Sequence, residues 1–79
     1  MFTFIPANKK KTDIPPDLFV PVDKQLVVNE TRKIFNRLGI PEEKVNEYHV
    51  IGYDIGDDDA IPLFENDSKP GELFELWHE

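Results

Sequence analysis

Apolar and polar residues alternate at the start of the chain, which is typical of a strand with one buried face. Residues 2–5 show this alternation and predict a short first strand that Pro6 ends. Residues 48–54, 60–65 and 72–78 are rich in β-branched and aromatic side chains and predict three more strands. Turn-forming residues separate these three stretches, so the pattern predicts an antiparallel meander.

The middle of the chain changes to a helical spacing. Three apolar side chains fall on one helical face: Ile34, Phe35 and Leu38. Asn29 is a good N-cap, and a helix that starts earlier could reach back to Asp23. Gly39 suits the left-handed residue after a helix, and Pro41 blocks continuation. We therefore predict a helix over residues 29–38.

These elements predict one small α+β domain in three parts. Residues 1–24 form an extended, proline-rich N-terminal segment with one short strand, in which prolines disfavour a helix. Residues 25–46 are helical, and residues 47–79 form the acidic three-stranded antiparallel meander. Pro62 lies inside the second meander strand and predicts an edge position or a bulge there.

Length and composition narrow the classes of protein. The 79 residues, 39% of them hydrophobic, allow one domain with one compact core. The chain has no cysteine, which excludes zinc–thiolate sites and favours a cytoplasmic protein. The first residues lack the order of a signal peptide, and no apolar run approaches the length of a membrane span.

The charge is negative and uneven. The formal net charge is −7, and residues 47–79 carry ten acidic residues against Lys69 alone. Such a surface repels phosphate backbones and attracts basic partners, so direct nucleic-acid binding is disfavoured. The cluster Lys9-Lys10-Lys11 is read as a solvated turn, with pairing to the acidic half of another copy as an alternative.

The stretch Gly52–Ala60, GYDIGDDDA, is the most conspicuous candidate for chemistry. A calcium loop starting at Asp54 would need a glycine where Asp59 stands and helices on both sides, so no metal site is predicted. No paired-carboxylate, serine–histidine or phosphate-binding glycine pattern is present, which predicts no catalytic residue and no cofactor. A hairpin turn remains, shaped by Gly56, with aspartates that must stay solvated.

Several short motifs resemble the SUKH superfamily of bacterial toxin-immunity proteins. They are Ile51-Gly52, the acidic turn Asp54–Asp59, the apolar strand Ile61–Phe64, the last strand Leu73–Glu79, and the helix-ending step Gly39-Ile40-Pro41. The resemblance covers residues 14–79 and implies binding and blocking of a toxin enzyme without catalysis. Members of the family are usually longer, with a helix after the last strand. Without that helix, Phe74, Leu76 and Trp77 are expected to be exposed on one sheet face.

The leading hypothesis is an acidic, non-catalytic protein that binds a partner with a basic surface, most simply an immunity protein. The carboxylates expected to steer the partner are Asp54, Asp57, Asp58, Asp59 and Glu65, and the expected anchors are Tyr53, Phe74 and Trp77. Alternatives are a phage-encoded nucleic-acid mimic that occupies a host DNA-binding protein, a homodimeric structural module, and a small enzyme.

Overall fold

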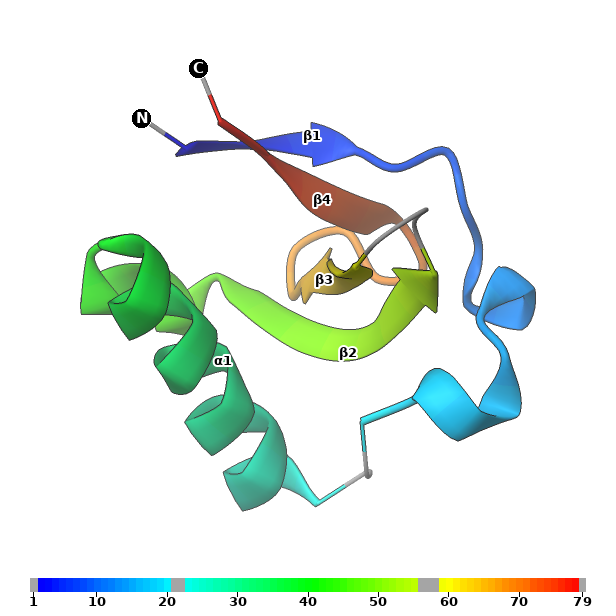
Figure 1. Cartoon of the computed structure of the whole chain (residues 1–79), viewed down its shortest axis with the longest axis horizontal. Helices are drawn as coiled ribbons and strands as arrows, with labels where there is room; N and C mark the ends of the chain where they lie inside the picture. Colours follow the sequence, from blue (N-terminus) through cyan, green and yellow to red (C-terminus); the bar gives the residue numbers. More distant parts are fainter. Residues whose placement is uncertain (1, 21–22, 56–58, 79) are drawn as a thin grey trace.

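The computed structural model describes residues 2–20, 23–55 and 59–78. The strands are β1 (Phe2–Pro6), β2 (Tyr48–Ile55), β3 (Ala60–Asn66) and β4 (Leu73–His78), the helix is α1 (Lys24–Leu38), and three 3₁₀ turns are η1 (Lys11–Asp13), η2 (Pro16–Leu18) and η3 (Glu42–Asn46). The strands form one antiparallel sheet in the order β1-β4-β3-β2 (Figure 1). The predicted α+β class is confirmed. The pattern did not place β1, which joins the meander beside β4.

α1 starts earlier in the chain than the predicted N-cap, Asn29. The Asp23 carboxylate caps the helix, where Oδ1 accepts hydrogen bonds from the N–H groups of Gln25 (2.9 Å) and Leu26 (3.2 Å). The prediction of Asn29 as N-cap is therefore wrong. Asn29 lies inside the helix, and its side-chain oxygen accepts from Gln25 Nε2 at 3.2 Å. Asp23 and Asn29 are both residue types that can cap a helix. Asp23 satisfies the free N–H groups of the first turn because the apolar face of α1 begins before Asn29.

The end of α1 agrees with the sequence. Gly39 has φ 75°, in the left-handed region that a residue with a Cβ enters only at a cost. The N–H of Ile40 donates to the carbonyl of Phe35 at 2.9 Å, and the N–H of Gly39 donates to that of Asn36 at 3.4 Å. These two bonds are the Schellman ending that the glycine predicted.

Both faces of the sheet bury apolar side chains. On the α1 side the core contains Ile34, Phe35, Val45, Val50, Phe64 and Phe74. On the other side a smaller cluster contains Ile14, Leu63 and Leu73. Figure 1 shows α1 across one side of the curved sheet and residues 7–20 passing along the opposite side. The proline-rich segment thus packs on the domain, because its Ile14 is buried against the second face.

Gly52 allows that segment to approach β2 closely. The β2–β3 register shifts between Val50 and Gly52, which leaves Ile51 as the extra residue of a bulge. A Cβ on Gly52 would lie 3.1 Å from Ile14 Cγ2 and 3.1 Å from the Leu18 carbonyl oxygen. A larger side chain would therefore push the segment away from the sheet.

Pro62 occupies a stretch of β3 that is paired on one side. β3 and β4 pair at two positions, Phe64 with Phe74 and Glu65 with Leu73. Pro62 pairs with Tyr53 of β2 and lies outside the part of β3 that pairs with β4. Its missing N–H therefore removes no bond to β4, as expected for a locally edge-like position.

Candidate functional site

The acidic stretch lies at the loop end of the β2–β3 hairpin. Ile55 pairs with Ala60 there, and the Ile55 side chain is 71% exposed. Asp54 precedes it on β2, and the exposed Asp59 stands just before β3. Asp57 and Asp58, also predicted to bind the partner, lie outside the described residues. The described part of this end thus has a large exposed apolar residue, Ile55, which directly follows Asp54 in the sequence.

Asp54 is held by a lysine from the N-terminal segment. Lys9 Nζ lies 2.5 Å from Asp54 Oδ2, and the N–H of Ile55 donates to Asp54 Oδ1 at 3.0 Å. The hydrogen-bonded ion pair lowers the pKa of the Asp54 carboxyl below its ordinary value and raises the pKa of Lys9. Asp54 therefore keeps its charge, but a cation accompanies it.

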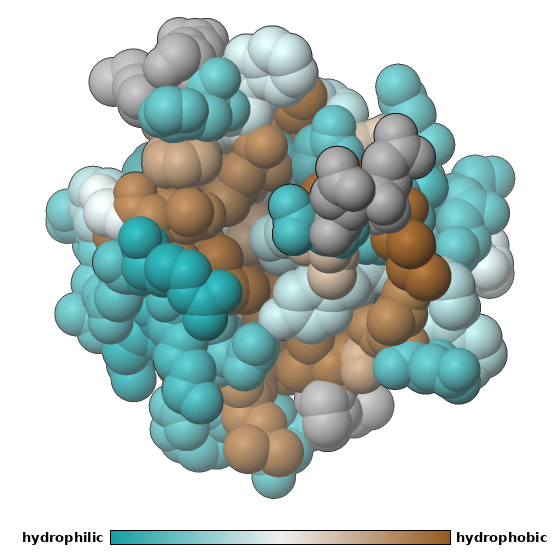
Figure 2. Space-filling view, in the orientation of Figure 1, coloured by the Kyte–Doolittle hydropathy of each residue, from teal (hydrophilic) through white to brown (hydrophobic). Residues whose placement is uncertain are grey.

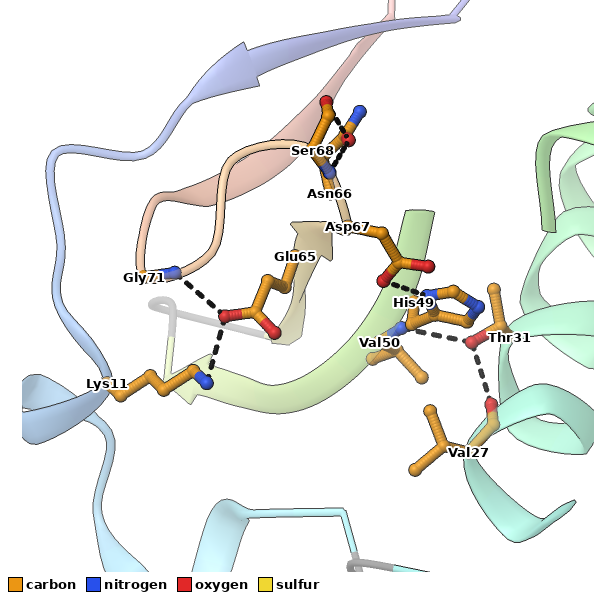
Figure 3. Close-up of polar contacts among 10 residues, drawn as sticks. All are labelled: Lys11, Val27, Thr31, His49, Val50, Glu65, Asn66, Asp67, Ser68 and Gly71. Carbon is orange, nitrogen blue, oxygen red and sulfur yellow. Dashed lines mark hydrogen bonds and ion pairs between the residues drawn. The ribbon is translucent and has the colours of Figure 1, made fainter. Parts of the chain in front are cut away.

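Glu65 is held in the same way, closer to the middle of the sheet (Figure 3). Its Oε2 lies 2.9 Å from Lys11 Nζ and accepts the N–H of Gly71 at 3.0 Å. Burial acts to raise the pKa of Glu65, but these two hydrogen bonds outweigh burial, so the pKa lies below its ordinary value. Glu65 therefore links the N-terminal segment to the β3–β4 turn.

A histidine–aspartate pair lies beside Glu65. His49 is the cross-strand partner of Glu65, and its Nδ1 lies 3.3 Å from Asp67 Oδ1. The two pairs together line the join between β2, β3 and the turn that follows β3 (Figure 3). Within this turn, Ser68 donates from both its N–H (2.8 Å) and its hydroxyl (2.6 Å) to Asn66 Oδ1. The serine hydroxyl is therefore engaged in fixing the turn.

The lysine cluster therefore has partners within its own chain. Lys9 and Lys11 bind carboxylates of the acidic half, across the sheet face that the N-terminal segment covers. From the sequence alone this cluster was predicted to be a solvated turn or a contact with another copy. No local pattern could show the ion pairs, because residues more than forty positions apart meet only after the segment folds back.

Tyr53 lines a groove beside α1. Its hydroxyl donates to Glu30 Oε1 at 2.9 Å, and burial, followed by this hydrogen bond, raises the pKa of Tyr53 to about 12. The groove has a volume of about 580 Å³ and runs between α1 and residues 17–20. Two large apolar side chains on its walls are exposed, Phe19 at 42% and Leu26 at 50%. Figure 2 shows hydrophobic surface between α1 and the facing segment, bordered by hydrophilic residues.

The two predicted anchors on β4 differ. Trp77 is 56% exposed, on the sheet face opposite α1. Phe74 is 6% exposed and belongs to the core under α1, so the expectation that it would be exposed is wrong. Residues of odd and even number on β4 point to opposite faces, and α1 covers the face that holds Phe74. The structure therefore does not bring Phe74 and Trp77 together on one surface.

No group of three or more His, Cys, Asp or Glu is placed to hold a metal ion in the part of the chain that the structure describes. Over the same residues, no helix has the length and apolar character that a membrane crossing needs. No family model, curated protein or solved structure matches this chain. The resemblance to the SUKH superfamily therefore stays a prediction.

Proposed function

We propose that this chain is a non-catalytic acidic binding protein that docks on a basic partner enzyme and blocks it, as toxin-immunity proteins do. The observation that carries the proposal is the loop end of the β2–β3 hairpin, where Ile55 is 71% exposed. In the sequence Ile55 directly follows Asp54, and Asp57, Asp58 and Asp59 come soon after it. An apolar anchor within a charged rim is the usual layout of a protein interface.

The charge of the whole chain supports a basic partner. The formal net charge of −7 produces a field that speeds association with positive surfaces. The ion pairs of Lys9 and Lys11 sit on the neighbouring part of the sheet and fix its shape. Steering then depends mainly on Asp57, Asp58 and Asp59, and anchoring depends on Ile55, which the sequence analysis did not single out.

The same ion pairs count against the nucleic-acid mimic. A mimic of a phosphate backbone needs negative charges in a regular row, as the backbone carries them. Here Lys9 and Lys11 place positive charges beside Asp54 and Glu65 on the acidic half. A mixed surface of this kind fits a protein partner with its own pattern of charges better.

Co-expression with neighbouring gene products tests the proposal. Each protein encoded beside the gene for this chain is expressed in bacteria alone and together with this chain. We expect one neighbour to stop growth when alone, to be tolerated when this chain is present, and to co-purify with it. If no neighbour is toxic, or if toxicity persists in the presence of this chain, the immunity function is refuted.

Association kinetics with that neighbour test the surface. The double variant Asp58→Asn/Asp59→Asn is compared with Glu43→Gln/Glu72→Gln, which removes the same charge from two exposed positions elsewhere in the chain. At low salt the first variant should slow association by about three- to tenfold and the second by much less. Ile55→Ala should speed dissociation instead, by about tenfold or more. Equal effects of the two double variants would show that the partner binds elsewhere.

A further inference from the structure

The two edge strands of the sheet differ in whether other segments hydrogen-bond to their outer sides. At the β2 edge, the N–H of Val50 donates to the Thr31 hydroxyl at 3.0 Å, and the carbonyl of Ile51 accepts the N–H of Val20 at 3.0 Å. β1 forms the other edge, and among the described residues no strand pairs with its outer side. An uncovered edge of this kind is a template for another strand.

The register of β1 shows which of its groups face outward. The N–H of Ala7 donates to the carbonyl of Leu73, its direct partner, at 2.9 Å. Hydrogen-bonded pairs alternate along an antiparallel ladder, so Ile5 and Thr3 also bond to β4. The N–H and C=O groups of Phe2 and Phe4 therefore point to the open edge. Pro6 is also at an outward position, where its missing N–H costs no bond to β4.

A hollow lies beside this edge. It has a volume of about 680 Å³, and its apolar lining includes Phe2 and Phe4 of β1 and Leu38 and Ile40 from the end of α1. Tyr48 also lines it, and the Tyr48 ring stacks on the Phe4 ring at 3.7 Å between centroids. Its polar lining comes from Lys44, Glu47 and His78. A strand added to β1 would thus find space of mixed character on the α1 side of the sheet.

We propose that β1 pairs with β1 of a second copy of this chain, antiparallel and centred on Phe4, which joins two sheets into one. In this register each Phe4 N–H meets the Phe4 carbonyl of the other copy, and each Phe2 N–H meets a Pro6 carbonyl. The proline, which cannot donate, falls opposite Phe2 and leaves both outward donors satisfied. The strand reads FTFIP and carries no charge, so no like charges meet across the join.

The neighbouring rows of side chains also suit a second copy. Trp77 is the cross-strand partner of Thr3, and Thr3 would lie beside Ile5 of the second copy. Pairing would therefore extend the apolar row next to an indole that is 56% exposed in the single chain. Edge strands that avoid pairing usually carry a lysine, a proline or a bulge. β1 has no lysine, and its register with β4 runs without a shift. Its one proline, Pro6, falls opposite Phe2 of the second copy in this register, where its carbonyl still accepts a hydrogen bond.

Sedimentation velocity over a wide range of concentration tests the pairing. The wild-type chain should shift from monomer to dimer as its concentration rises. The shift should need less protein at higher salt, because two copies of charge −7 repel each other. This salt dependence is opposite to that expected for a basic partner, so failure of one proposal is distinguishable from failure of the other.

Matched lysine variants locate the contact. Thr3 and Thr12 are both exposed, so Thr3→Lys and Thr12→Lys change the charge equally, the first on β1 and the second in η1. Thr3→Lys should raise the dimer Kd by about tenfold or more, and Thr12→Lys should leave it within about twofold. In the wild type, exchange of the Phe4 amide hydrogen should slow as concentration rises. The proposal is overturned by a monomer at every concentration, by equal effects of the two variants, or by Phe4 exchange that ignores concentration.

Discussion

Replacement of Thr31 by valine should destabilise the protein even though the two side chains have nearly the same shape. Thr31 is fully buried, and its hydroxyl donates to the Val27 carbonyl at 2.7 Å while it accepts the N–H of Val50 at 3.0 Å. Valine would leave that N–H without a partner at a buried position (Figure 3). A buried unsatisfied donor costs about 1–3 kcal/mol. For a domain of this size, a loss of about 2 kcal/mol lowers the Tm by about 8–16 °C.

Thermal unfolding of Thr31→Val and Thr31→Ser checks the magnitude. Serine keeps the hydroxyl and loses one methyl group, which should cost about 0.5–1.5 kcal/mol and thus less than valine. Amide exchange at Val50 should speed up in the valine variant and change little in the serine variant. A valine variant that is as stable as the wild type, or more stable than the serine variant, would show that this hydrogen bond does not hold the β2 edge to α1.

Two further predictions concern the N-terminal segment. Gly52→Ala should lower the Tm, because the new Cβ would meet Ile14 at 3.1 Å and such overpacking costs about 1–3 kcal/mol. Trypsin should then cleave faster at Lys11, and an unchanged Tm and cleavage rate would contradict the close contact. The folded pKa of Glu65 is depressed, so its pair with Lys11 stabilises the protein above pH 4.5 and the stabilisation is lost as the pH falls through the folded pKa. The urea midpoint of Glu65→Gln should therefore lie below that of the wild type at neutral pH and approach it below pH 4.5; a constant difference across that range would count against the pair.

Much of the secondary structure could be predicted because its causes are local. Alternation predicted β1, and runs rich in β-branched and aromatic residues predicted the other three strands. The Gly39 step predicted the end of α1, because a left-handed residue and a following proline act within one turn. The start of α1 was harder, since Asp23 and Asn29 are both able to cap a helix. Only the packing of the first turn decides which of them does so.

The candidate site was predicted only in part. The apolar runs on both sides of the acidic stretch predicted two antiparallel strands, and β2 and β3 do pair there. The predicted turn glycine, Gly56, lies with Asp57 and Asp58 outside the described residues. The exposure of Ile55 did not follow, because a strand pattern gives two faces but not where the cover ends. For the same reason Phe74 and Trp77 were grouped together, although α1 buries the first and leaves the second exposed.

The sequence by itself determined the order and type of the main elements and the acidic second half, since each depends on neighbouring residues or on composition. Only the tertiary structure decided that β1 joins β4 and forms an open edge, and that Lys9 and Lys11 bind Asp54 and Glu65. These contacts join residues far apart in the chain. They depend on how the N-terminal segment crosses the sheet, which no local pattern encodes.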